Sequence, residues 1–202
     1  MHRTVALVAV FLAITGCAAP INVRNAEAHA RAGYGAISRG DWDTARRQFA
    51  QAVVNADLGN AELSGKWQVN YQYGRALGVT CFWEEAEKYL LRSMQFSEQI
   101  DRAPRLSLYE LGLLSQKQGK SAQAVSYFAQ LIPLMEKEGL RATYPLGVAD
   151  AYERYAASLE ATGQTESAAR NRIEARSIRN ANPTATPFGT VTPYGSTCAQ
   201  AS

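Results

Sequence analysis

The hydrophobic positions divide the chain into a short apolar run, a long stretch of helical period and two segments without period. Residues 5–14 are continuously apolar and follow a positively charged start. A permanent transmembrane helix needs about 20 apolar residues, so this shorter run is typical of a signal peptide. Residues 26–182 place small and apolar side chains at helical spacing, whereas residues 18–25 and 183–202 do not. The pattern predicts a helical domain flanked by two non-helical segments.

Four stretches of the helical region share one order of small and aromatic residues. They span residues 26–59, 67–100, 105–138 and 149–182, with Gly33, Gly74, Gly112 and Ala156 at the first small position and Phe49, Leu90, Phe128 and Arg172 at the aromatic one. This order resembles the tetratricopeptide repeat, a helix–turn–helix of about 34 residues. The fourth copy departs most from the pattern, as terminal repeats often do.

Packing explains why these residue types recur. Two antiparallel helices approach closely only where side chains are small, and a large side chain opposite fills the remaining space. Glycine inside a helix costs about 1 kcal/mol relative to alanine, so glycines in one register indicate a packing requirement. We therefore predict an all-α fold, a right-handed α-solenoid of about four tetratricopeptide-like helix hairpins. An ordinary helical bundle is the alternative.

Turn residues mark where the second helix of a repeat begins. Gly40, Gly119 and Gly163 precede Asp41, Ser121 and Thr165, which we expect to cap the helices that follow. After Asn182 the Thr-, Pro-, Gly- and Ser-rich residues 183–202 form a tail that we expect to be disordered or laid along the surface.

The segment Ile14-Thr15-Gly16-Cys17 resembles the bacterial lipobox. The resemblance implies that residues 1–16 are a cleaved signal peptide, that Cys17 is acylated, and that residues 17–25 tether the domain to the lipid. Acylation by more than one chain anchors a protein stably. By similarity to Gram-negative lipoproteins, Ala18 after the cysteine favours the periplasmic face of the outer membrane. The alternative is an ordinary secretory leader with a chance cysteine.

Composition excludes several classes of function. The net charge of +3 gives no reason to expect a nucleic-acid partner. Of the two histidines, His2 lies in the predicted leader, so His29 alone remains for acid–base or metal chemistry. No phosphate-binding glycine loop, nucleophile elbow or metal-spaced Cys/His set is present. We expect a non-catalytic protein without cofactor or metal.

In the tetratricopeptide family the first helix of each repeat lines a concave groove. Transferred by register, these groove positions are Tyr34, Gln68, Tyr71, Arg75, Tyr109, Leu113, Gln116, Lys117 and Glu153, together with Glu27, Ile37, Leu106, Asp150 and Glu160. The three tyrosines would form an aromatic floor for a protein or peptide partner. The alternative is that the tyrosines pack against neighbouring helices of the solenoid.

Three functions are compatible with this scaffold. The first is a membrane-anchored adaptor that binds a protein partner, in pilus, secretion or cell-envelope assembly by resemblance to similar lipoproteins. The second is a periplasmic enzyme or carbohydrate-binding protein, for which Asp150, Glu153 and Glu160 are the available carboxylates. The third is an assembly protein whose groove binds its own tail. Such a protein could form a homo-oligomer.

Two cysteines remain besides Cys17. Cys81 and Cys198 are able to pair in an oxidising periplasm, since an extended tail is long enough to fold back to the second repeat. The alternative is that Cys81 is a small buried hydrophobe while Cys198 is free or joins two chains.

Overall fold

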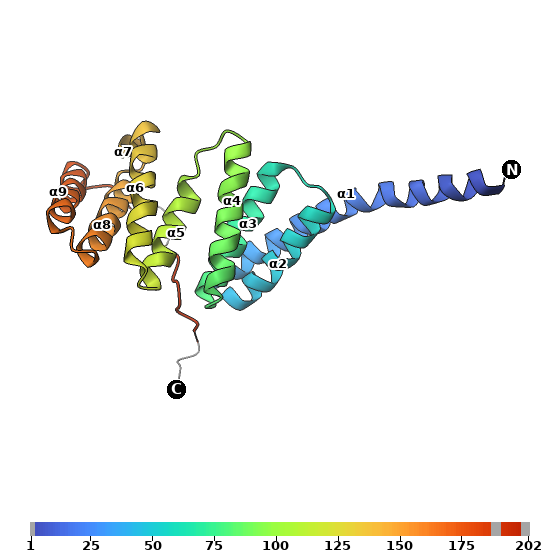
Figure 1. Cartoon of the computed structure of the whole chain (residues 1–202), viewed down its shortest axis with the longest axis horizontal. Coiled ribbons are helices and arrows are strands. Elements are labelled where there is room, and N and C mark those ends of the chain that lie inside the picture. The colour runs from blue at the N-terminus through green and yellow to red at the C-terminus, as the bar shows by residue number, and fades with distance from the viewer. Residues whose placement is uncertain (1–2, 187–190, 199–202) are drawn as a thin grey trace.

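The computed structural model describes residues 3–186 and 191–198, with side chains from residue 18 onward. Every regular element in these two ranges is a helix (Figure 1). The helices are α1 (Arg3–Ser38), α2 (Trp42–Leu58), α3 (Leu63–Val79), α4 (Trp83–Gln99), α5 (Arg105–Lys117), α6 (Ser121–Lys137), α7 (Leu140–Thr143), α8 (Pro145–Ala161) and α9 (Thr165–Ala181).

The helices form four stacked hairpins, as predicted. α1 packs on α2, α3 on α4, α5 on α6 and α8 on α9, while α2–α3, α4–α5 and α6–α8 contacts join successive hairpins. Further contacts of α5 with α3 and α8 bring the first helices of the last three hairpins side by side. The array is therefore elongated, with α1 at one end and α9 at the other (Figure 1). The single turn α7 lies between the third and fourth hairpins.

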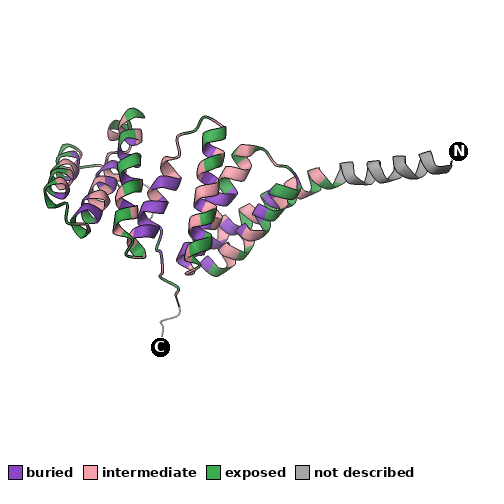
Figure 2. Ribbon diagram, in the orientation of Figure 1, coloured by how far each residue is buried: buried purple, intermediate pink, exposed green. Residues whose placement is uncertain are grey.

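Within each of the first three hairpins, a glycine lies against a large apolar side chain of the partner helix. The pairs are Gly33 with Phe49, Gly74 with Leu90 and Gly112 with Phe128, where a Cβ on the glycine would lie 2.8, 2.7 and 2.6 Å from the larger side chain. Those three larger side chains are fully buried, and buried positions follow the inner faces of the helices (Figure 2). Close approach at glycine, predicted from the repeat pattern, is confirmed.

The turn inside each hairpin contains a residue in the left-handed conformation, two positions before the second helix. This residue is glycine in three hairpins, namely Gly40, Gly119 and Gly163, with φ between +71° and +78°. In the second hairpin it is Cys81, with φ of 70°. A side chain makes this conformation costly by roughly 1–2 kcal/mol. The cysteine at a glycine position therefore has a role that the turn itself does not require.

Only one of the three predicted helix caps is present. Asp41 caps α2, because its side chain accepts a hydrogen bond of 3.0 Å from the Thr44 amide. Ser121 and Thr165 do not cap; they are the first helical residues of α6 and α9. One residue lies between the left-handed glycine and the first residue of α6 or α9, and it takes the cap position. This residue is Lys120 before α6 and Gln164 before α9, and neither side chain makes a capping hydrogen bond.

The expectation that residues 18–25 are non-helical is wrong. They belong to α1, which runs without a break through Pro20. The helix packs there against the end of α2, since a Cβ on Gly59 would lie 2.8 Å from the Val23 nitrogen and 2.9 Å from the Ala19 oxygen. This packing against α2 stabilises the helix although residues 18–25 lack a helical spacing of apolar side chains. The side chain of Cys17, and Met1 and His2 of the predicted signal peptide, lie outside the described part of the chain.

No helix among the described residues is both long and apolar enough to cross a bilayer.

Candidate functional site

The C-terminal tail returns from α9 to the middle of the array and lies against α3 and α5. We call residues 191–198 the tail segment, and the surface formed by Arg75, Gly78, Glu110 and Leu114 the tail groove. The Gly195 amide donates to the Gly78 carbonyl oxygen at 3.3 Å, and the Thr197 hydroxyl donates to the Val79 carbonyl oxygen at 2.9 Å. The end of α3 thus binds the tail through its backbone.

A buried carboxylate lies at the centre of the groove. Glu110 of α5 is 4% exposed and accepts hydrogen bonds from three hydroxyl groups. These donors are Tyr71 of α3 at 3.1 Å, Thr192 at 2.9 Å and Tyr194 at 2.8 Å. Two of the three belong to the tail segment, so the tail supplies donors that a buried carboxylate needs.

Arg75 of α3 balances the charge of this carboxylate. Its Nε lies 3.2 Å from a Glu110 oxygen and also donates to the Thr192 hydroxyl at 2.9 Å. The guanidinium lies over the rings of Trp42 and Tyr71, 5.8 and 5.6 Å from their centres. Burial, the largest single influence, lowers the pKa of Arg75, but the charge of Glu110 and the neighbouring phenols of Tyr71, Tyr194 and Tyr34 together raise it, so that the net pKa is above its usual value.

The two tyrosines on Glu110 remain neutral donors. Burial, followed by the negative charge of Glu110, raises the pKa of Tyr71 and of Tyr194 well above the ordinary phenol value. A raised pKa means that docking stabilises the protonated phenol. The stabilisation that docking of the tail contributes is therefore fully present below the pKa of a free phenol, about 10. This stabilisation is lost as the pH rises through the higher pKa of the docked state.

The Tyr194 ring occupies space that a side chain on α3 would fill. A Cβ added to Gly78 would overlap this ring and would lie 3.0 Å from Leu114. Tyr194 itself is 7% exposed. Gly78 therefore accommodates the tail, in contrast to Gly33, Gly74 and Gly112, which accommodate the partner helix within a hairpin.

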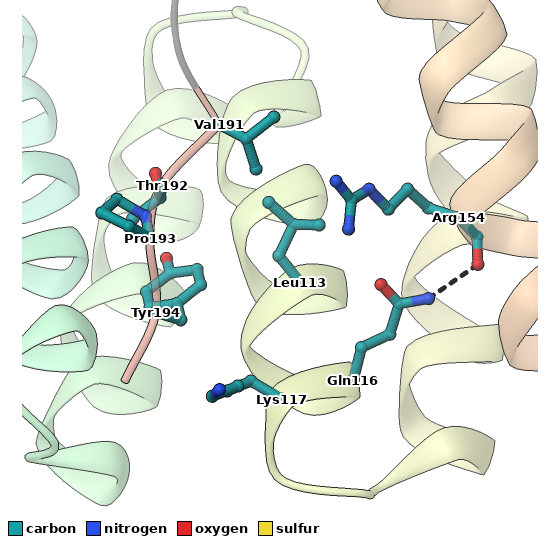
Figure 3. A pocket seen from close by; sticks show the side chains of 8 residues that line it. All are labelled: Leu113, Gln116, Lys117, Arg154, Val191, Thr192, Pro193 and Tyr194. Carbon is teal, nitrogen blue, oxygen red and sulfur yellow. Dashed lines mark hydrogen bonds between the residues drawn. The ribbon is translucent and has the colours of Figure 1, made fainter. Parts of the chain in front are cut away.

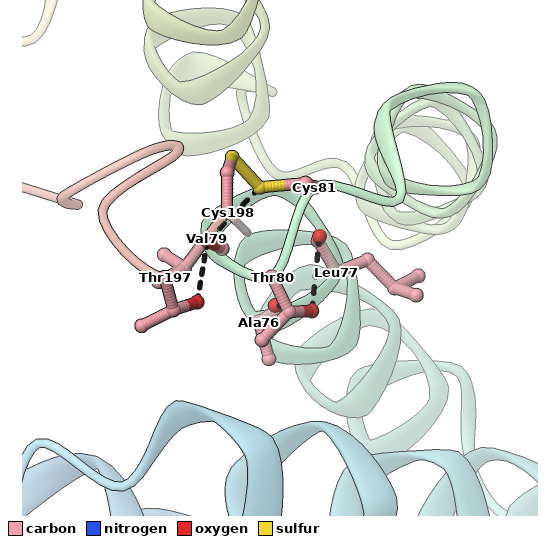
Figure 4. The surroundings of a disulfide bond; sticks show 7 residues. All are labelled: Ala76, Leu77, Val79, Thr80, Cys81, Thr197 and Cys198. Atoms are coloured by element: carbon pink, nitrogen blue, oxygen red, sulfur yellow. Dashed lines mark hydrogen bonds between the residues drawn. A yellow bond between two sulfur atoms is a disulfide. The ribbon is translucent and has the colours of Figure 1, made fainter. Parts of the chain in front are cut away.

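A disulfide joins the tail to the second hairpin (Figure 4). It links Cys81 with Cys198 across 117 residues of sequence, with the two Cα atoms 5.5 Å apart. Of the two alternatives drawn from the sequence, the structure has the paired one. The left-handed cysteine in the turn before α4 is therefore the attachment point of the tail.

A pocket of about 340 Å³ lies beside the tail segment (Figure 3). One wall comes from the helices and the other from the tail: Leu113, Gln116, Lys117 and Arg154 face Val191, Thr192, Pro193 and Tyr194. Gln116 spans from α5 to α8, donating to the Arg154 carbonyl oxygen at 2.7 Å and to the Ser158 hydroxyl at 2.8 Å.

Of the nine groove positions named first in the sequence analysis, five lie at the tail groove or the pocket. They are Tyr71, Arg75, Leu113, Gln116 and Lys117. The remaining four make other contacts: Tyr34 packs edge-on against Phe49, with Gln68 near its hydroxyl, Tyr109 donates to Asp150, and Glu153 pairs with Arg179 at 2.7 Å. Tyr34 and Tyr109 therefore pack between helices, the alternative to a continuous aromatic floor.

The transfer of family positions missed Glu110 and Gly78. Glu110 follows directly after the groove position Tyr109, and Gly78 has no side chain that would indicate a role in binding. A signal for Glu110 was present in the sequence, because it is the lone charged residue between Leu106 and Leu114. An isolated carboxylate in an apolar helix is expected to be buried and paired.

The acidic residues proposed for catalysis are engaged in ion pairs. Asp150, Glu153 and Glu160 pair with Arg154, Arg179 and Arg172 in turn. Each of these three carboxylates thus has its own arginine as ion-pair partner. Across the described ranges, no group of three or more His, Cys, Asp or Glu side chains is placed to hold a metal. His29 hydrogen bonds Gln48 at 2.9 Å.

Comparison with known proteins supports the fold. No family model and no curated protein matches the chain. Among solved structures, BtubC (BKLC) from P. vanneervenii is similar, with a TM-score of 0.73 and 16% identity over 82% of this chain and 67% of that one. A putative kinesin light chain with nearly identical TPR-like repeats, from Podosopora anserina, has a TM-score of 0.66 and 17% identity over 79% of this chain and 77% of that one. At these identities the likeness establishes a tetratricopeptide-like solenoid.

Proposed function

We propose that this protein is a non-catalytic scaffold that binds a protein partner through the concave face of its helical repeats. The observation that carries the proposal is the tail groove, where a segment distant in sequence is held by side chains from two consecutive hairpins. Repeat solenoids present such extended concave surfaces for binding. The pairing of Asp150, Glu153 and Glu160 with arginines favours this role over an enzyme.

Site-specific photo-crosslinking in cells tests which face meets the partner. A photoreactive residue replaces Lys117, which lines the pocket beside the tail, or Ala129, which is exposed on α6. We expect a discrete high-mass adduct from position 117 and none from position 129, because only the concave face contacts the partner. The same adducts from both positions, or none from position 117, would contradict the proposal.

We further propose that acyl chains on Cys17 hold the scaffold at the periplasmic face of the outer membrane. The support is the lipobox-like segment at residues 14–17 and the alanine that follows it. In this arrangement the projecting first turns of α1 (Figure 1) would leave with the signal peptide, and residues 18–25, which pack against the end of α2, would lie next to the membrane surface.

Replacing Cys17 with serine is expected to move nearly all of the protein out of the outer-membrane fraction, because serine has no thiol to accept a lipid. Fractionation and intact-mass measurement report the shift and the loss of acyl mass. Cys81→Gly is the matched control: it removes another cysteine and should leave the protein at the membrane. Membrane association that is equal in all three chains would exclude the anchor.

A further inference from the structure

We propose that the tail groove is a binding site for a turn-forming peptide segment of the Thr-Pro-Tyr-Gly type, supplied by a protein partner, and that the tail segment, in which the Ser196 amide donates to the Pro193 carbonyl oxygen at 3.1 Å, is its built-in occupant. This inference rests on the proposed function and specifies the chemistry of the partner. Its basis is the way in which residues 191–198 are bound.

The groove selects hydroxyl groups at two positions. The hydroxyls of Thr192 and Tyr194 converge on the single carboxylate of Glu110. The Thr192 hydroxyl also accepts from Arg75, so it bridges both charges of the pair. A segment with phenylalanine in place of the tyrosine would leave the buried carboxylate short of a donor. A phosphotyrosine would bring a second negative charge against it.

The position after the tyrosine requires glycine. Gly195 has φ of +71°, a conformation that other residues rarely adopt. A Cβ there would also lie 2.6 Å from Lys117 and 3.1 Å from Trp83. The groove therefore favours a segment that has hydroxyl groups at two positions separated by one residue, followed directly by glycine.

Each of the first three hairpins is closed by contacts that do not involve the tail. Glycine contacts such as Gly33 with Phe49 and Gly112 with Phe128 close each hairpin from within, away from the tail groove. The pocket beside the tail extends the groove toward Arg154 of α8, and Val191 at its edge is 47% exposed. This surface offers a longer segment more contact than the tail itself makes.

The disulfide keeps the built-in occupant in place. A tethered segment has a high effective concentration at its own site, so a competitor binds weakly while the tether holds. Exchange with a dithiol would leave free thiols on Cys81 and Cys198 and a disulfide on the dithiol, and would release the end of the tail. We therefore expect the disulfide-bonded chain to be occupied and the unbonded chain to be open to a partner.

The test measures binding of a labelled peptide, Val-Thr-Pro-Tyr-Gly-Ser-Thr, to the full chain by fluorescence anisotropy. The receiving chain carries Cys81→Gly, Cys198→Ser and Tyr194→Ala; glycine at position 81 matches the other three hairpin turns. We expect this chain to bind at least about ten-fold tighter than the disulfide-bonded chain. The phenylalanine and phosphotyrosine peptides should bind at least about ten-fold more weakly than the parent peptide.

Two glycine variants of α3 provide the matched control. Gly78→Ala in the same chain should abolish binding, because a Cβ there overlaps the tyrosine ring. Gly65→Ala, where no atom lies within 4 Å of the added Cβ, should leave binding unchanged. If the triple variant does not fold, as judged by circular dichroism, the wild-type chain treated with a dithiol takes its place.

Several results would overturn the inference. They are equal binding of the tyrosine and phenylalanine peptides, insensitivity to Gly78→Ala, or no binding by a folded open chain. Dimers formed by exchange of tails, seen by light scattering, would assign the groove to a second copy and overturn it as well. If crosslinks at position 117 appear while the peptide fails, the scaffold function stands and only the partner chemistry is wrong.

Discussion

Replacing Phe128 with alanine is expected to lower the free energy of unfolding by about 3–5 kcal/mol. The Phe128 ring is fully buried and fills the space opposite Gly112, where a Cβ would lie 2.6 Å away. Because glycine has no side chain that moves in, the cavity persists after the ring is removed. Urea unfolding followed by circular dichroism measures the change.

Phe82→Ala is the matched control for this change. Phe82 is 43% exposed, and Arg46 lies over its ring at 4.5 Å. We expect its loss to cost only about 0.5–1 kcal/mol, the value of an exposed cation–π contact. Similar costs for the two phenylalanines would contradict the packing scheme of glycine against a large side chain.

Replacing Glu110 with alanine is expected to cost about 3–5 kcal/mol of stability, since it leaves Arg75 buried without its carboxylate. The two side chains are 5% and 14% exposed, so solvent screens the pair little. Thr192 and Tyr194 lose their shared acceptor at the same time. Urea unfolding of the disulfide-bonded chain measures the cost, and faster proteolysis of the tail should accompany it.

The control for Glu110 is Glu153→Ala. Glu153 also pairs with an arginine, at 2.7 Å, but the two side chains are 45% and 41% exposed. An exposed pair is worth about 0–1 kcal/mol. A cost below 1 kcal/mol for Glu110→Ala as well would mean that the carboxylate is not the centre of a buried network.

The repeat architecture was predictable because its determinant is local and periodic. Gly33, Gly74 and Gly112 recur in one register, and each meets the large residue that the same repeat provides. Helix starts were less predictable, as Ser121 shows, because the residue between a turn glycine and the helix takes the cap position whatever its identity.

The groove was predictable only in part, because its determinants come from distant parts of the chain. Family register identified Arg75 and Tyr71, but the carboxylate that binds them lies one position away from the transferred set. Docking of the tail was one of three possibilities in the sequence. Nothing local in residues 191–198 indicates that Thr192 and Tyr194 meet Glu110, since that contact spans more than 80 residues.

The most direct test of the account is whether the tail lies on α3 in solution. In the intact disulfide-bonded chain, the Tyr194 ring is packed on Gly78 and near Leu114. Nuclear Overhauser effects between the Tyr194 ring protons and the Gly78 α-protons should therefore be strong, and the Gly78 resonances should carry a large ring-current shift. Absence of both, with helical signals intact, would contradict the account.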